Sequence, residues 1–336
     1  MKTIKNYTIP TSLQRRKTML KKIYTAVLSL MIAQGMAAIG FAGGVGTTGA
    51  QFLKIGTGAR PIGMGQAFMA VADDLNALYY NPAGLAQQYE RQATASYLRY
   101  FQDVSIGFLG YSQPLGEGTF GVGLNYLYVG GIEKRRLVSD GGVGDSDVPE
   151  DKFGAYDAAL SLSYADQELL GRYVEGLDVG FNVKIIRQEI DTEDANSVAI
   201  DLATLYRTGI TDLNMSLGVY NIGPEVKFVE EGDPLPFGVG FGMSYRMLNR
   251  KLLIAGDVLD YVIDERFYGD IGLEYSLIEV MALRAGYRFG MDSELGGGAG
   301  LGTGLGFNVW GVCLDYAFAP FGELGDTHRI SISTKF

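Results

Sequence analysis

From Gln92 to the last residue, apolar side chains alternate with polar or small ones at a period of two. In residues 119–128, for example, Phe120, Val122 and Leu124 share one face, and glycine, threonine and asparagine occupy the other. Successive side chains of a β-strand point to opposite faces, so this pattern is typical of strands rather than helices. A strand between lipid and a polar lumen requires the same alternation. The pattern therefore predicts an all-β fold.

Fourteen segments carry this pattern, and each is long enough for a tilted membrane crossing, which takes about 9–11 residues. An even number of strands is expected of a bacterial barrel. Outside the N-terminus no apolar run reaches the roughly 18 residues that a membrane helix needs. We therefore predict a transmembrane antiparallel β-barrel of about 14 strands. The segments are 92–101, 104–113, 118–130, 153–165, 176–188, 196–207, 212–222, 236–248, 250–261, 267–278, 279–289, 296–306, 307–319 and 327–336.

Residues 1–42 have the three parts of a secretory signal peptide. A basic stretch at 15–22 precedes an apolar stretch at 23–32, and small residues before Ala42 fit a cleavage site. We predict signal-dependent export to the bacterial outer membrane. The alternative is an uncleaved anchor across 23–42, but Gln34 and Gly35 interrupt its short apolar run.

The net charge of the exported chain is strongly negative. Residues 1–42 hold seven basic side chains and no acidic one, so their removal changes the net charge from −10 to −17. Nucleic-acid binding needs a basic face, so this charge balance argues against a nucleic-acid partner.

Residues 43–90 do not show the strand pattern and are predicted to form a hatch, or plug, for a barrel made by residues 91–336. Asp73 and Asp74 open a stretch with helical spacing, which Pro82 and Gly84 end. Asn81 and Pro82 are predicted to form a turn, since Asn bonds nearby backbone and Pro sets φ. This turn either serves the hatch fold alone or shapes the floor of a ligand cavity.

The last strand segment alternates up to a terminal aromatic residue, Phe336. A final amphipathic strand that ends in Phe is the usual signal for the barrel-assembly machinery of the outer membrane. We therefore predict that Phe336 is an assembly signal and that outer-membrane lipid surrounds the barrel.

No arrangement of residues indicates an enzyme, a cofactor or a metal centre. His328 is the only histidine, which excludes multi-histidine metal sites, and a hydrolase built on Asp326 and His328 would lack the G-x-S-x-G motif. Two G-x-G-x-x-G matches lack the strand and helix context of nucleotide binding. An acidic loop at 140–151 is predicted to be a solvated surface, with calcium binding as the alternative. Cys313 is the only cysteine and is predicted to be packed or lipid-facing.

Two motifs at opposite ends of the chain resemble the PorV/PorQ family, a branch of the FadL-like outer-membrane barrels. The first is Gly-Ala-Arg-Pro-Ile-Gly-Met-Gly-Gln-Ala-Phe at 58–68, followed by Ala-Val-Ala-Asp-Asp at 70–74 and Tyr-Asn-Pro-Ala-Gly-Leu at 80–85. The second is Asp-Tyr-Ala-Phe at 315–318 with Leu-Gly-Asp-Thr-His-Arg-Ile-Ser at 324–331. The resemblance therefore spans essentially the whole exported chain.

The resemblance implies a fourteen-stranded barrel with an N-terminal hatch. For PorV relatives it implies a non-catalytic component of type IX secretion, which binds cargo proteins from the translocon and passes them to surface-attachment machinery. The alternative is a FadL-like channel that takes up hydrophobic small molecules.

Two further observations favour the secretion role. The residues Asn182, Lys184, Asp201 and Ser244 fall on the predicted lumen face and are polar, which does not suit an apolar tunnel. If the first strand starts in the periplasm, the loop at 222–236 faces outward. Its apolar residues Val226, Phe228 and Val229 are predicted to be exposed and to contact a partner protein.

Overall fold

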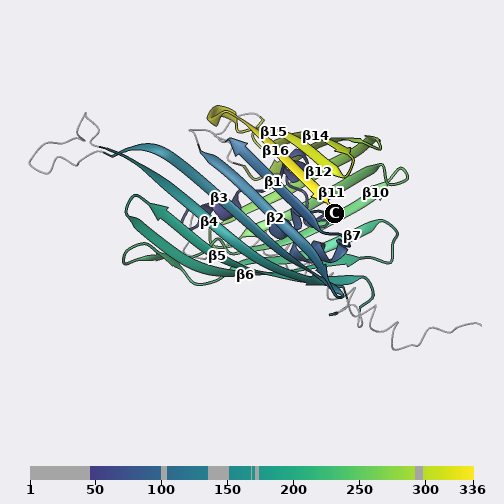
Figure 1. Cartoon of the computed structure of the whole chain (residues 1–336), viewed down its shortest axis with the longest axis horizontal. Helices are drawn as coiled ribbons and strands as arrows, with labels where there is room; N and C mark the ends of the chain where they lie inside the picture. Colours follow the sequence, from purple (N-terminus) through teal and green to yellow (C-terminus); the bar gives the residue numbers. More distant parts are fainter. Residues whose placement is uncertain (1–45, 100–103, 135–150, 168, 171–173, 292–297) are drawn as a thin grey trace, which may run out of the picture.

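In the computed structural model, fourteen antiparallel strands close into one barrel (Figure 1). The structure describes residues 46–99, 104–134, 151–167, 169–170, 174–291 and 298–336, so the predicted signal peptide and most of the acidic loop lie outside it. The predicted fold and number of strands are confirmed. The strands are β1 Gln92–Arg99, β2 Ser105–Leu115, β3 Gly118–Lys134, β4 Asp151–Asp166, β5 Leu177–Ile190, β6 Glu193–Arg207, β7 Leu213–Ile222, β10 Gly238–Met247, β11 Leu252–Tyr261, β12 Arg266–Ile278, β13 Met281–Phe289, β14 Leu301–Val309, β15 Val312–Pro320 and β16 Asp326–Lys335.

Neighbouring strands of the barrel follow one another along the chain, and β1 pairs with β16 to close the sheet. Between β7 and β10 along the chain lies a small hairpin of two short strands, β8 Val226–Lys227 and β9 Gly232–Asp233. These two strands pair with each other and are not part of the barrel sheet. The largest displacements from the predicted segments are at β14, which begins at Leu301 rather than 296, and at β15, which begins at Val312 rather than 307. Gly298 and Gly300, just before β14, have φ of 106° and 97°, which a regular strand does not allow.

The alternation predicted from the sequence separates lipid from lumen. On β6, Val198, Ile200 and Leu202 are 44–51% exposed, whereas Ala199 and Asp201 between them are buried. Apolar side chains on the outer face meet lipid without a solvation penalty. Within the described ranges, no helix has the length and apolar character needed to cross a bilayer.

The barrel is taller on one side than on the other. Strands β3 to β6 have 14–17 residues, whereas β13 to β16 and β1 have 8–10. Figure 1 shows the long strands reaching past the short ones at the end where β3 leads into β4. We call this end the loop end, and the opposite end, with the tight turn between β2 and β3, the turn end.

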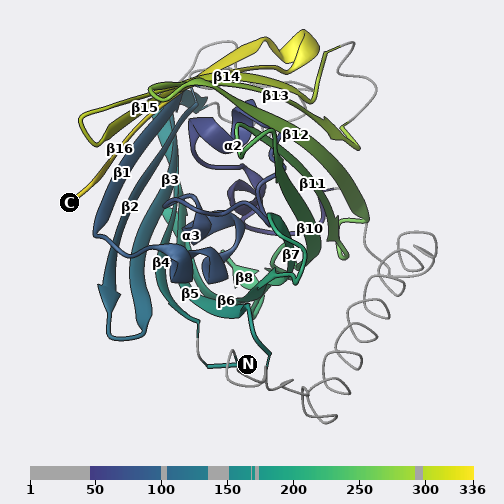
Figure 2. The ribbon, with the colours of Figure 1, turned by 90° about the vertical axis from the view of Figure 1, so that its right-hand side faces the viewer.

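Residues 46–91 fill the inside of the barrel as the hatch (Figure 2). They enter near the loop end, where Thr48 contacts Asp264, and lead into β1 at the turn end. The hatch contains four short elements: η1 Gln51–Lys54, α2 Ala59–Gly63, α3 Ala77–Tyr80 and η2 Pro82–Gln87.

The helix predicted to start at Asp73 is shorter than expected, because α3 begins only at Ala77. Asp74 accepts hydrogen bonds from the backbone and side chain of Asn76 instead of capping a longer helix. At the other end Asn81 is extended, with φ −165°, and Pro82 follows it, so the helix ends where the sequence predicted.

The main hydrophobic core lies between the hatch and the inner face of the barrel. Phe68, Leu75 and Leu85 of the hatch are almost fully buried, and they belong to one cluster with Phe108 of β2 and Leu253 of β11. Burial of each such side chain stabilises the fold by about 1.5–3 kcal/mol. The hatch is therefore held in part by apolar contact.

Glycines of the wall let the hatch backbone approach closely. A Cβ added to Gly286 of β13 would lie 2.1 Å from the carbonyl carbon of Met64, and one at Gly302 of β14 would lie 2.1 Å from the Ile62 oxygen. On the opposite wall, Gly180 of β5 faces Pro82 and Ala83 in the same way. These distances leave no room for any side chain, so the close contact between the hatch backbone and the wall requires glycine at these positions.

We predict that Gly286→Ala destabilises the protein by at least about 1–3 kcal/mol, since the new methyl group overpacks a backbone contact. Thermal unfolding in detergent and protease cleavage of the hatch measure the effect. Gly269→Ala on β12 is the matched control, because its Cβ would meet only Phe289 at 3.9 Å. Equal stability of the two variants would contradict the proposed close contact between the hatch backbone and β13.

Candidate functional site

A cluster of partly buried ion pairs fastens the hatch at the turn end. Arg60 of α2 binds Glu274 of β12 with two hydrogen bonds of 2.7 and 2.8 Å, and it also binds Asp73 and Asp74. Arg246 of β10 donates to Asp73 at 2.6 Å. Burial alone would raise the pKa of Asp73, but the guanidinium groups of Arg60 and Arg246 hold that pKa below its ordinary value.

The same cluster extends across the wall. Arg284 of β13 donates to Glu274 at 2.7 Å and to Asp315 of β15 at 2.7 Å. The ion cluster therefore consists of Arg60, Asp73, Asp74, Arg246, Glu274, Arg284 and Asp315. It borders an open cavity of about 330 Å³ at the turn end. Asp73 and Asp74, expected to start a helix, thus belong to a cluster that joins the hatch to four strands.

Asn81, Pro82 and Gly84 form a buried turn that supports the hatch. The Asn81 Oδ1 accepts from the backbone N–H of Ala83 at 3.0 Å, and its Nδ2 donates to the carbonyl oxygens of Met69 and Thr204. A Cβ at Gly84 would lie 2.0 Å from the Ala72 oxygen. These contacts favour the structural explanation of the motif, although the preceding Tyr80 lines the chamber described next.

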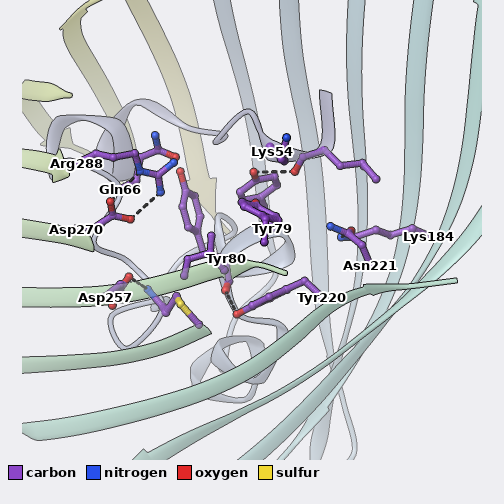
Figure 3. A pocket seen from close by; sticks show the side chains of 14 residues that line it. Lys54, Gln66, Tyr79, Tyr80, Lys184, Tyr220, Asn221, Asp257, Asp270 and Arg288 are labelled. Atoms are coloured by element: carbon purple, nitrogen blue, oxygen red, sulfur yellow. Dashed lines mark hydrogen bonds and ion pairs between the residues drawn. The ribbon is translucent and has the colours of Figure 1, made fainter. Parts of the chain in front are cut away.

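A small chamber lies between the hatch and the wall in the middle of the barrel (Figure 3). Its volume is about 40 Å³, and its lining includes both hatch and wall side chains. Three ion pairs surround it, and each joins a cation of the lining to its own carboxylate. They are Arg288 with Asp270 at 2.7 Å, Lys184 with Asp201 at 2.7 Å and Lys54 with Asp264 at 2.8 Å.

The lumen is polar where the sequence predicted it. Asn182, Lys184, Asp201 and Ser244 are all buried inside the barrel. Asn182 donates to the Leu78 oxygen at 2.9 Å, and Ser244 donates to the Ala70 oxygen at 2.8 Å, so both also hold the hatch. Polar residues of the wall therefore serve as attachment points rather than as an open aqueous lining.

The loop end carries a wider vestibule above the hatch. It has a volume of about 460 Å³ and combines apolar with charged side chains. A pocket of about 180 Å³ adjoins it and shares part of its lining. The vestibule residues are Gly46, Gln51, Phe52, Lys54, Ile55, Leu127, Asp157, Arg266, Tyr268, Gly290 and Met291.

The predicted contact residues of the 222–236 loop differ in exposure. Val229 is 77% exposed, as predicted. Val226 is only 2% exposed, so the predicted exposure of Val226 is wrong. The β8–β9 hairpin folds over the start of the hatch, where the Gly49 N–H donates to the Pro234 oxygen at 2.9 Å. Val226 consequently packs in a cluster with Phe52, and Phe228 packs against the same cluster.

The end of the chain lies on the outside of the barrel at the turn end. Phe336 is 63% exposed, and its N–H donates to the Arg91 oxygen at 2.9 Å. Its role in assembly stays a prediction.

His328 faces outward and hydrogen-bonds Tyr316 at 2.7 Å. Among the described residues no group of His, Cys, Asp and Glu is arranged to hold a metal, and Cys313 faces the lumen beside Asp315.

The sequence did not indicate the roles of Arg60, Glu274 and Arg284. Glu274 and Arg284 fall on the lumen face of their strands, and Arg60 lies in the hatch, so all three charges lie inside the barrel. A charge inside the barrel needs an oppositely charged partner. The position of these charges is therefore the one signal in the sequence that could have identified them. Their partners lie up to 214 residues away, so no local pattern connects them.

We predict that Arg60→Met lowers the free energy of unfolding by about 1–3 kcal/mol, because Asp74 loses its cation while Asp73 and Glu274 keep only Arg246 and Arg284. Thermal or denaturant unfolding in detergent measures this loss. Arg187→Met is the control. Its pair with Glu189 is exposed at 55% and 49%, and exposed pairs contribute only about 0–1 kcal/mol. Similar losses in both variants would disprove the fastening role.

The contact of Asp264 with the hatch predicts a pH dependence at the loop end. Burial alone would raise the pKa of Asp264, but hydrogen bonds from Lys54 and Thr48 lower it below its ordinary value. A carboxyl with a lowered folded pKa contributes stability above its unfolded pKa of about 3.9 and loses that contribution as the pH falls through the folded value. Between about pH 6 and pH 3, the Tm of the native protein should therefore fall more than that of Asp264→Asn. Parallel Tm curves would contradict this.

Several solved structures share this fold. The P. putida toluene transporter TodX is 13% identical, with a TM-score of 0.60 over 84% of this chain and 99% of that chain. The CymD monoaromatic hydrocarbon channel is 12% identical, with a TM-score of 0.61 over 84% of this chain and 98% of that one. A Pseudomonas aeruginosa FadL homologue is 10% identical, with a TM-score of 0.54 over 83% and 98%. Such low identities show the fold alone.

No curated protein sequence matches this chain significantly. A family model described as "Type IX secretion system protein PorV" matches residues 42–258, more than half of the chain. The match includes the hatch, with its Arg60 and Asn81 contacts, and the tall strands β3 to β6. The protein is thus an outer-membrane β-barrel, and it belongs to the PorV family of type IX secretion system proteins.

Proposed function

We propose that this protein binds exported proteins at its loop end, as a non-catalytic component of type IX secretion. It receives cargo from a secretion translocon and passes it to surface-attachment machinery. The observation that carries the proposal is the match to the PorV family over residues 42–258.

The shape of the loop end supports a binding role. The vestibule of about 460 Å³ lies beside the tall wall of β3 to β6, and it offers apolar side chains such as Phe52 and Leu127 together with charged ones. Mixed apolar and polar surfaces of this kind suit protein recognition. Val229, between β8 and β9, is exposed.

The attachment of the hatch supports a receptor rather than a conduit. Buried ion pairs, glycine contacts and an apolar core all hold it in the lumen. Movement of the hatch would separate Arg60 from Glu274 on the wall, and loss of a largely buried ion pair costs several kcal/mol. A fixed hatch keeps the membrane sealed while cargo binds above it.

Export and membrane insertion complete the proposal. Residues 1–42 direct export, the barrel-assembly machinery reads the last strand and Phe336, and outer-membrane lipid covers the apolar outer face. The loop end then faces the cell exterior, where bound cargo meets the attachment machinery.

A second candidate function is uptake of hydrophobic small molecules. It is supported by the fold shared with the toluene transporter TodX and by the pocket of about 180 Å³ beside the vestibule. That pocket is lined by Leu98, Leu301, Pro320 and Phe321, among others, together with the two arginines Arg288 and Arg329.

Site-specific photo-crosslinking in living cells tests the proposed function. We predict that a photo-crosslinking residue in place of Val229 or Leu127 captures exported proteins, because Val229 is exposed and Leu127 lines the vestibule. Trp310 is the control, since it is 99% exposed but lies in the turn between β14 and β15 at the turn end. Mass spectrometry identifies the adducts.

Affinity purification from detergent-solubilised outer membrane separates the two candidates. Co-purification of a translocon barrel or of exported proteins supports the secretion role. A barrel that purifies alone with a stoichiometric hydrophobic molecule, and gives no protein adducts at Val229 or Leu127, would refute that role and support uptake.

A further inference from the structure

The tall wall of β3 to β6 rises above its neighbour β7 and leaves one edge of the sheet open. The ladder between β6 and β7 ends at the pair of Ile200 with Ile222. Pro224 follows two residues later, and proline has no N–H to donate, so β7 does not continue beside β6. Above this point, residues 193–199 of β6 form a ladder with β5 and with no other strand that the structure describes.

This open edge stands in water rather than in lipid. On the outer face of β6, the apolar side chains of Ile200 and Val198 are followed by the exposed polar ones of Asn196 and Asp194. Arg187, which pairs with Asn196 across the ladder to β5, is 55% exposed. Charged side chains are unfavourable against hydrocarbon, so the lipid boundary lies below them. The top of β6 therefore projects into the aqueous phase at the loop end.

Alternate residues at the top of β6 turn their backbone groups toward the open edge. At the other end of β6, the Arg207 N–H donates to the Gly176 oxygen beside β5 at 2.8 Å. The N–H of the next residue, Thr208, donates to the first residue of β7 at 3.1 Å. The register between β5 and β6 is unbroken, so this alternation continues along the strand. The N–H and C=O groups of Asp194 and Asn196 therefore point away from β5, to the open side.

The chain that leaves β7 closes the lower part of this edge. The Ser197 Oγ donates to the Pro224 oxygen at 3.1 Å, and a Cβ on Gly223 would lie 2.1 Å from the Val198 oxygen. The stretch that stays open is therefore 193–196. An open strand edge is a template on which an extended peptide adds as a further strand, held by backbone hydrogen bonds.

Acidic side chains around the open edge indicate the charge of such a peptide. The hairpin between β5 and β6 lies beside the β8–β9 hairpin, because Ala195 and Val226 pack in one cluster. In residues 187–196 and 225–233, two basic side chains, Arg187 and Lys227, accompany eight acidic ones. The acids are Glu189, Asp191, Glu193, Asp194, Glu225, Glu230, Glu231 and Asp233. A segment that carries Lys or Arg complements this surface.

We propose that the open edge of β6 at 193–196 docks exported proteins, by adding an extended basic segment of the cargo as a further strand. This inference rests on the proposed function and names how the cargo is recognised. The backbone of Asp194 and Asn196 aligns the segment, and its Lys or Arg side chains pair with the surrounding acids. The same acids disfavour a second copy of this chain on the edge, since like charges would then meet.

The variant Asn196→Pro tests the strand addition. Proline removes an N–H that points to the open side and leaves the hydrogen bonds to β5 in place, so the barrel should still assemble. Asn196→Ala is the matched control, because it removes the same side chain but keeps the N–H. With a photo-crosslinking residue at Val229, we expect Asn196→Pro to capture about fivefold less exported protein than Asn196→Ala, at equal amounts of barrel in the outer membrane.

A charge variant gives a second readout that leaves the backbone unchanged. Glu193→Gln combined with Glu231→Gln should lower the capture at Val229 and weaken its dependence on salt, since two acids near the edge lose their charge. Glu323→Gln is the control, because Glu323 is an exposed acid at the loop end of the short wall, between β15 and β16. It should leave the capture unchanged.

The two experiments separate this inference from the proposed function. Equal capture by Asn196→Pro and Asn196→Ala would overturn the strand addition while the native protein still captures cargo. Equal effects of the charge variant and of Glu323→Gln would overturn the basic segment. If the native protein captures no exported protein at Val229 or Leu127, the proposed function itself fails, and this inference fails with it.

Discussion

Closure of the sheet between β1 and β16 is the constraint on which the rest of the structure depends. A bilayer offers no hydrogen-bond partner to an open strand edge, so every strand must pair on both sides. Pairing of Gln92–Arg99 with residues 328–335 joins the first strand of the sheet to the last. Closure then assigns one face of every strand to lipid and the other to the lumen, and the alternation in the sequence follows from that assignment.

The lumen must then be filled, and the hatch fills it. Soluble domains bury a core between layers, but the outer face of this sheet is reserved for lipid. The largest fully buried side chains therefore include Phe68, Leu75 and Leu85 of the hatch. Glycines such as Gly286 bring the hatch backbone onto the wall, and the pairing of Arg60 with Glu274 fixes its position. Because these contacts are of different kinds, loss of one leaves the others in place.

A fixed hatch also relates the fold to the proposed role. The same barrel occurs in hydrocarbon channels and in the PorV family, so the wall alone does not decide the function. The features that bear on it lie at the loop end, where the tall strands, the β8–β9 hairpin and the start of the hatch form the vestibule. Selection on loops and lumen residues can change the task of such a barrel while its lipid-facing surface stays the same.

The sequence by itself determined the strands, because alternation is a property of each segment alone. All fourteen segments appear close to their predicted positions, and polar residues such as Asp201 face the lumen as expected. Tertiary structure alone decided the partners. Arg60 meets Glu274 across 214 residues, and Val226 turns inward only because the hatch begins beneath its hairpin. The central chamber likewise exists only where hatch and wall meet. The alternation in the sequence indicates whether a residue faces lipid or the lumen. Its contact partner depends on how the closed barrel brings distant segments together.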